Sequence, residues 1–159
     1  MPKSCRRWAT LLAPLALVAM GGCALFSGGG EPTPSPIQVS LVASARLNPD
    51  DQGQALPTVV HVYQLRSPAR LEAAEFEALY RSEKETLGED LLQVDEIVVE
   101  PGATAARKLP RHKDARALAA VGLFRRPSGA SWRSAVELPP PGKAASFAFA
   151  VEDYRIVRR

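Results

Sequence analysis

The amino-acid sequence predicts a mainly β protein: a β-sandwich with a small helical insertion, preceded by a signal peptide and a flexible linker. Three observations support this. Seven or so short stretches alternate in hydrophobicity or are rich in β-branched and aromatic residues, with turn-forming residues between them. One segment after the second stretch has helical spacing instead. The first 36 residues combine a basic, apolar stretch with one rich in glycine and proline.

Residues 1–22 are predicted to be an export signal. Three basic residues precede an apolar run over residues 9–20, which is shorter than the roughly 20 residues that a membrane-spanning helix needs. Small residues follow the run, and this order is typical of a cleaved signal peptide. The four residues Met20-Gly21-Gly22-Cys23 resemble a bacterial lipobox, in which cleavage exposes a cysteine that carries lipid.

Cys23 is the predicted lipidation site. Only Cys5 could pair with it within the chain, and Cys5 lies in the segment predicted to be removed. A lipoprotein cysteine carries three acyl chains, and two already hold a protein firmly to a membrane. Because Ala24 rather than aspartate follows the cysteine, general lipoprotein sorting in Gram-negative bacteria implies the outer membrane, facing the periplasm. An ordinary secreted protein is the alternative.

Residues 23–36 are predicted to be a lipidated, flexible linker, and residues 37–159 a single domain. The linker contains three consecutive glycines and alternating prolines, a composition that cannot build a core. A flexible linker of this length spans about 20 Å, and a polyproline-like one about 40 Å. The domain is therefore expected to lie close to the membrane.

The net charge of +3 does not indicate a nucleic-acid partner. It comes from three basic residues in the predicted signal peptide, and without them the 20 Lys and Arg fall to 17, equal to the 17 Asp and Glu. The charges are nevertheless segregated, since residues 72–100 contain ten acidic residues and two basic ones, whereas residues 107–133 contain eight basic residues and one acidic one. We expect two solvated faces that attract each other in the fold, with a polyanion site as the alternative.

The predicted strands begin directly after the linker. Residues 37–43 alternate apolar and polar side chains, and residues 58–65 are rich in β-branched and aromatic ones. Residues 117–124 are apolar on both alternating faces, which favours a strand covered by the opposite sheet and by a helix, although the same pattern also permits a buried helix. The remaining predicted strands are residues 96–100, 103–109, 131–138 and 145–151, with 154–157 as an extension of the last.

Residues 69–81 predict the helical insertion. Ser67 is the expected N-cap and Pro68 the proline of the first turn, and acidic residues follow early in the segment. Phe76, Leu79 and Tyr80 recur at helical spacing. Residues 86–92 predict a second short helical turn or a loop.

The sequence predicts no enzyme, no cofactor and no metal site. Neither His61 nor His112 has another histidine or a cysteine near it at ligand spacing. There is no Gly-x-Ser-x-Gly nucleophile motif and no glycine loop that could cradle a phosphate. The glutamates at the start of the helix are expected for the helix dipole alone.

The loop over residues 47–57 is longer than the two to five residues usual for a hairpin. Its length fits either a crossover between two sheets or a recognition surface, and the pattern leaves both open.

These features together resemble the TssJ (SciN) family, the outer-membrane lipoproteins of bacterial type VI secretion systems. The matching pieces follow the lipobox in a specific order and extend over nearly all of the domain. They are Leu47-Asn48-Pro49, Val60 to Leu65, Phe76 with Leu79, Thr86 to Leu92, Val99 to Gly102, Val121 to Arg125 and Trp132-Arg133.

The resemblance implies a transthyretin-like β-sandwich with an added helical part and no enzymatic activity. It implies binding to the periplasmic C-terminal domain of the inner-membrane protein TssM, with TssL in the same membrane complex. The loop between the first two strands is a contact region in this family, with Asp50, Asp51 and Gln52 as candidates for its tip. The implied partner-binding residues are Asn48, Pro49, Asp50, Asp51, Gln52, Gly53, Gln54 and Leu56.

Two other functions remain open at this point. One is a lipid-anchored periplasmic carrier or sensor of a small ligand, which would need a deep apolar pocket with a few convergent polar groups. The other is a periplasmic hydrolase, which would need clustered titratable groups in a cleft.

Overall fold

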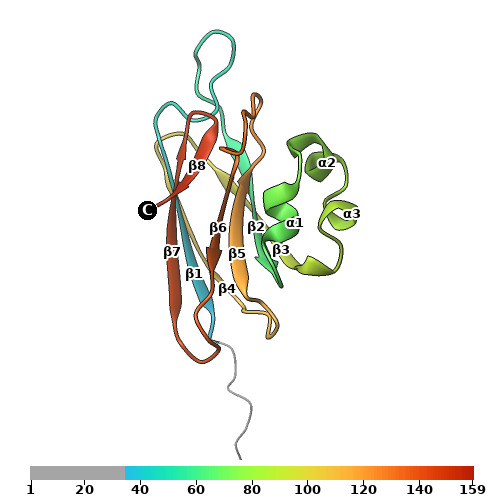
Figure 1. Ribbon diagram of the computed structural model, residues 1–159. Helices are drawn as coiled ribbons and strands as arrows, with labels where there is room; N and C mark the ends of the chain where they lie inside the picture. The colour runs from blue at the N-terminus through green and yellow to red at the C-terminus, as the bar shows by residue number, and fades with distance from the viewer. Residues whose placement is uncertain (1–34) are drawn as a thin grey trace, which may run out of the picture.

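The computed structural model describes residues 35–159 (Figure 1), so the predicted signal peptide and Cys23 lie outside the described residues. Eight strands and four short helical segments make up this part of the chain. The strands are β1 (Ile37–Ala43), β2 (Thr58–Leu65), β3 (Leu91–Val99), β4 (Thr104–Leu109), β5 (Ala117–Gly122), β6 (Arg133–Glu137), β7 (Ala145–Glu152) and β8 (Arg155–Arg158). The helical segments are α1 (Ala69–Ala73), α2 (Phe76–Arg81), α3 (Glu83–Leu87) and the 3₁₀ turn η1 (Gly88–Asp90).

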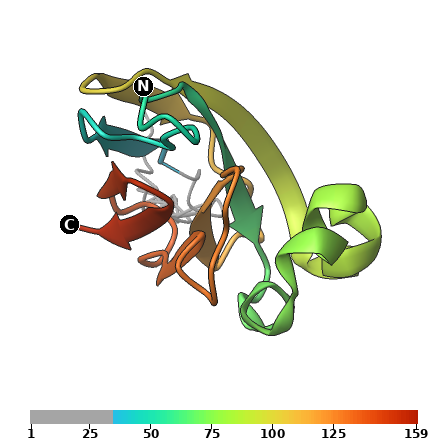
Figure 2. The same ribbon diagram turned by 90° about the horizontal axis from the view of Figure 1, so that it is seen from above.

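The strands form two four-stranded sheets that face each other, which confirms the predicted β-sandwich (Figure 2). One sheet has the order β4-β1-β7-β8 and the other β3-β2-β5-β6. β1 is antiparallel to β4 and parallel to β7, and all other pairs are antiparallel. Because β1 and β2 belong to different sheets, the loop between them crosses from one sheet to the other.

The hydrophobic core lies between the two sheets. The alternation predicted for β1 is confirmed, since Ile37, Val39 and Leu41 are at most 1% exposed while the residues between them are exposed or half-buried. Val60 and Val62 of β2 are fully buried as well. This burial of one face of each sheet is the main source of stability for a sandwich.

The helical insertion covers the second sheet from outside. All six residues of β5 are buried, which confirms that this strand is covered on both faces. Each of the three α-helices contributes one buried leucine: Leu71, Leu79 and Leu87. The helices are too short to be stable alone, so their packing on the sheet holds them in place.

The predicted single helix over residues 69–81 is wrong in one respect. It is broken into α1 and α2 because Ala74 and Glu75 are extended, with ψ of 144° and 146°. Arg133 explains the break, since its guanidinium donates hydrogen bonds to the backbone carbonyls of Glu72 and Ala74, which end α1. The N-cap position is Pro68 rather than Ser67, although the Ser67 hydroxyl accepts a hydrogen bond from the Ala69 amide.

The predicted strands differ from the observed ones by at most two residues at either end, with two exceptions. Residues 154–157 do not extend β7; the chain turns at Asp153, where φ is 42°, and β8 pairs back on β7. β3 begins at Leu91 rather than at residue 96, and it pairs with β2 along its whole length. β3 is an edge strand with exposed Val94 and Val98, so its sequence lacks the clear alternation of a half-buried strand.

The expected attraction between the acidic and basic segments does not take the form of ion pairs. Within residues 35–159, no ion pair joins residues 72–100 to residues 107–133. The acidic residues pair locally instead, as Glu77 does with Arg81. In the described part of the chain, none of the helices has the length and hydrophobicity needed to cross a bilayer.

Candidate partner-binding site

The loop between β1 and β2 projects from one end of the sandwich. In Figure 1 it rises above the strands, whereas β1 begins at the opposite end of the molecule. The loop therefore crosses from one sheet to the other, as the crossover interpretation held. It also protrudes beyond the ends of the strands.

The base of this loop is buried and cross-linked. Leu47 is fully buried, and its carbonyl accepts a hydrogen bond from the Leu56 amide at 3.0 Å. Asn48 is 4% exposed and has a φ of 46°, a left-handed conformation that asparagine tolerates better than most residues. Its Oδ1 accepts a hydrogen bond from the Arg125 amide at 2.9 Å, and its own amide donates to the Asp153 carbonyl at 2.7 Å.

The tip of the loop is organised by one carboxylate. Oδ1 of Asp50 accepts hydrogen bonds from the backbone amides of Gln52 at 2.9 Å and Gln54 at 2.8 Å. Gly53 supplies the left-handed residue that closes the turn, with a φ of 81°. The tip therefore has a defined backbone before any partner arrives.

Two other segments brace the loop from the side. The Tyr154 hydroxyl, in the turn before β8, donates a hydrogen bond to the Pro49 carbonyl at 2.6 Å. Asp51 forms an ion pair with Arg126 and lies 4.0 Å from the Arg125 guanidinium. The segment after β5 and the β7–β8 turn thus form part of the same surface.

The eight residues predicted for partner binding fall into two groups. Asn48 is buried, and Pro49, Asp50 and Leu56 are half-buried, so these four chiefly hold the loop's shape. The exposed residues are Asp51, Gln52, Gly53 and Gln54. Sequence reasoning missed Arg125, Arg126 and Tyr154, because nothing local to them indicates contact with a loop more than 70 residues earlier.

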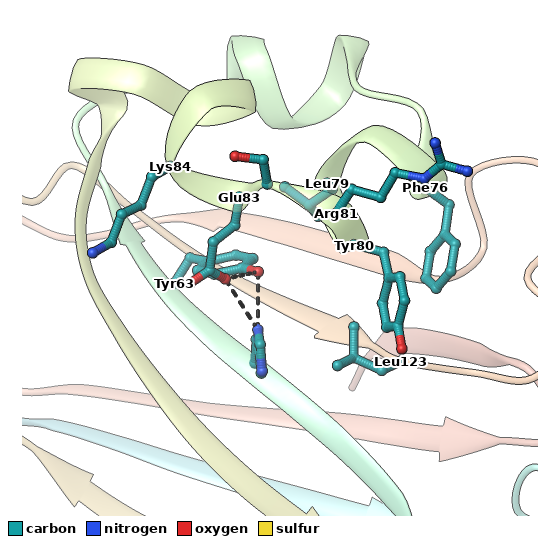
Figure 3. A pocket seen from close by; sticks show the side chains of 10 residues that line it. Tyr63, Phe76, Leu79, Tyr80, Arg81, Glu83, Lys84 and Leu123 are labelled. Carbon is teal, nitrogen blue, oxygen red and sulfur yellow. Dashed lines mark hydrogen bonds and ion pairs between the residues drawn. The ribbon is translucent and has the colours of Figure 1, made fainter.

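A pocket of about 380 Å³ lies between β2 and helices α2 and α3 (Figure 3). On its floor the Tyr63 hydroxyl donates a hydrogen bond to Oε2 of Glu83 at 2.8 Å. Nδ1 of His61 lies 3.1 Å from the same hydroxyl and 3.2 Å from the same carboxylate oxygen. These polar groups satisfy one another, which suits a role in fixing α3 to the sheet better than binding of a ligand.

Burial raises the pKa of Tyr63 well above its ordinary value, and the hydrogen bond and negative charge of Glu83 raise it further. Tyr63 thus acts as a neutral hydrogen-bond donor and not as a base. Residues 35–159 contain no group of three or more His, Cys, Asp or Glu placed to hold a metal ion.

Residues 35–154 match the model of the family described as type VI secretion lipoprotein, VasD, EvfM, TssJ, VC_A0113. The chain belongs to this family of type VI secretion lipoproteins. The match covers every strand except β8, together with the loop between β1 and β2. None of the curated protein sequences matches the chain as a relative.

Three solved structures place this TssJ-family chain among relatives of the same fold. The type VI secretion lipoprotein TssJ1 from Pseudomonas aeruginosa is 27% identical, with a TM-score of 0.70, over 79% of this chain and 97% of that chain. Serratia marcescens Lip, described as a membrane-bound component of the type VI secretion system, is 22% identical, with a TM-score of 0.69, over 79% and 98%. A chain of the structure described as "T6SS protein TssM C-terminal domain (869-1107) from EAEC" is 18% identical, with a TM-score of 0.69, over 78% and 97%.

Substitution of Asn48 tests how the loop base is held. Asn48→Ala removes the acceptor for the Arg125 amide and places alanine in a left-handed conformation, so we expect the free energy of unfolding to fall by about 2 to 4 kcal/mol. Asn48→Gly relieves the backbone strain but not the lost hydrogen bond, and about 1 kcal/mol should return. Urea denaturation measures both values, and equal stability of the two variants and the wild type would contradict the assignment.

Tyr63→Phe tests the raised pKa of the tyrosine. The unfolded chain releases the Tyr63 proton near pH 10, whereas the folded protein retains it, so this group's contribution to stability is complete below about pH 10 and declines above it. We therefore expect wild type to exceed Tyr63→Phe in stability at pH 8, and the difference to shrink by pH 11. Denaturation curves at the two pH values provide the measurement, and a difference that stays constant or grows would show that the pKa is not raised.

Proposed function

We propose that this TssJ-family chain is an outer-membrane lipoprotein, held by acyl chains on Cys23 and facing the periplasm. Its loop over residues 48–56 binds the periplasmic C-terminal domain of a TssM-like inner-membrane protein, and through that protein it joins TssL in one membrane complex. The observation that carries this proposal is a braced, protruding loop at the end of the sandwich opposite the start of β1 (Figure 1).

The geometry of β1 suits a link between a membrane and a partner. Its seven residues span about 23 Å, and the predicted linker leads into one end while the loop leaves the other. A domain tethered through that linker is attached at the end opposite the loop, so the loop can point away from the membrane. In the periplasm, this is the direction from which an inner-membrane partner arrives.

The hydrogen bonds within the loop support a role in binding. Asp50, Asn48 and Tyr154 fix the backbone in the free protein, so less conformational entropy is lost when a partner binds. Tethering also confines the domain to a thin layer beneath the membrane, which raises its effective concentration for a partner fixed in the opposite membrane. A modest interface would therefore be enough to hold the complex.

The choice of partner is supported by the family and by one structure of the same fold. The family is described as type VI secretion lipoproteins, and a chain of this fold occurs in a structure named for a TssM C-terminal domain. No catalytic role is proposed, because the polar cluster of His61, Tyr63 and Glu83 is internally satisfied. The small-ligand carrier is less well supported, since the space between the sheets is filled by core side chains.

Replacing Cys23 by serine tests the anchor. The variant should be exported, fold normally and still bind the partner domain, because Cys23 precedes the first strand of the sandwich in the sequence. We expect it to leave the outer-membrane fraction after a high-salt wash, which removes proteins held only by surface charge. A variant that stays in the washed outer-membrane fraction would contradict lipid anchoring.

Replacing residues 50–54 with a glycine-serine segment of the same length tests the loop. Leu47, Asn48 and Leu56 are kept because they hold the end of the sandwich. We expect recovery of the TssM-like periplasmic domain on co-purification to fall at least about tenfold, as happens when central interface contacts are lost.

The matched control replaces residues 140–144, an equally long stretch in the loop before β7 at the opposite end. Circular dichroism should show both variants folded. The loop assignment fails if the two replacements recover equal amounts of partner.

A further inference from the structure

Two loops surround the position where the chain enters the sandwich. Ile37, the first residue of β1, pairs with Leu109 at the end of β4 and with Ala145 at the start of β7. The segments over residues 110–116 and 138–144 therefore lie at this end, the lower one in Figure 1. They are joined to each other, because the Arg116 carbonyl accepts a hydrogen bond from the Leu138 amide at 2.8 Å.

The two segments and the adjoining strand ends carry more basic than acidic residues. The acidic residues on the two segments and the adjoining end of β6 are Asp114 and Glu137, and Glu89 and Asp90 of η1 lie beside the end of β2. Within the described residues, none of the six basic residues named next forms an ion pair. We call the following six residues the basic end: Arg107, Lys108, Arg111, Lys113, Arg116 and Lys143.

Arg111 places a fixed charge inside this end. It is 7% exposed, and its Nη2 donates to the carbonyls of Pro139 at 2.7 Å and Ala115 at 3.2 Å. Its Nε and Nη1 make no hydrogen bond in the described part of the chain. Burial, and then the charge of Arg116, lower the pKa of Arg111, but a guanidinium stays protonated at neutral pH. The positive charge is therefore not neutralised by a neighbouring carboxylate.

The basic segment between β4 and β5 is also held in shape. The Gln64 side chain, which is fully buried, donates to the Pro110 carbonyl and accepts from the His112 amide, both at 2.8 Å. Five of the six basic residues nevertheless have exposed side chains, Arg111 being the exception. The result is a charged surface on a rigid support.

The linker decides which anionic partner is nearest. Thirteen residues separate Cys23 from Ile37, and they span about 20 Å if flexible and about 40 Å if extended. A domain held this way has the end at Ile37 within that distance of the bilayer. Clusters of lysine and arginine beside a membrane attachment bind anionic lipids and add a second signal to an acyl anchor.

We propose that the basic end binds the anionic phospholipid surface of the membrane that holds the anchor. The contact sets the domain upright, with the loop over residues 48–56 pointing away from the bilayer. This inference rests on the proposed anchoring through Cys23.

The test uses the chain from residue 23 onward with Cys23→Ser, so that no acyl chain contributes to binding. The signal peptide is not needed for folding. The solved TssJ1 chain matches only about 79% of this chain, yet 97% of that chain is covered, so a protein of this fold forms without the remaining part. Flotation at low salt compares vesicles of phosphatidylethanolamine alone with vesicles that also contain phosphatidylglycerol and cardiolipin. The test variant is Lys108→Gln/Lys113→Gln/Lys143→Gln, and the matched control is Arg46→Gln/Arg81→Gln/Lys84→Gln, three exposed basic residues elsewhere.

We expect binding to the anionic vesicles to exceed binding to the neutral ones at least about tenfold, and the test variant to lose at least about tenfold of it. The control should keep its binding, and added salt should release the protein. Equal binding to both vesicles, or equal binding by the two variants, would overturn the proposal. So would binding to purified peptidoglycan in place of anionic vesicles, which would assign the basic end to the cell wall. The Cys23→Ser protein used in this test carries no acyl chains. Its failure to bind would therefore not contradict the proposed anchoring through Cys23.

Discussion

The pairing of β1 along both of its edges is the constraint on which the rest of the structure depends. β1 bonds to β4 on one side and to β7 on the other, and its apolar face is buried against the second sheet. A strand held in this way cannot slide or swing without breaking both ladders. Its two ends, where the chain enters and where the loop leaves, therefore stay at a fixed separation.

Buried polar side chains extend this rigidity to the loops. Asn48 joins the loop after β1 to Arg125, and Gln64 holds the segment before β5. Arg133 ends α1 and ties the helical insertion to β6. In each case a side chain satisfies backbone groups that are distant in sequence, which stabilises a loop that cannot form regular structure of its own. These contacts favour a rigid domain with a different surface at each end.

Much of this fold could be predicted from the sequence, because the strands that build the core show their burial in alternating or continuous apolar residues. The break in the helix and the turn before β8 could not, since they depend on Arg133 and Asp153 in their folded surroundings. The loop was recognisable from its length. Which of its residues are exposed was not, because Asn48 is buried by partners from the segments near Arg125 and Asp153.

The claim that the domain is a rigid spacer between membrane and partner is tested most directly by a distance between its two ends. Spin labels at Gln38→Cys and Arg46→Cys, in a chain with Cys23→Ser, would lie near the start of β1 and just before the loop, outside the residues proposed to bind the partner. Double electron–electron resonance should give one narrow distance distribution that does not change when the TssM-like domain is added. A broad distribution, or one that shifts on binding, would contradict the account.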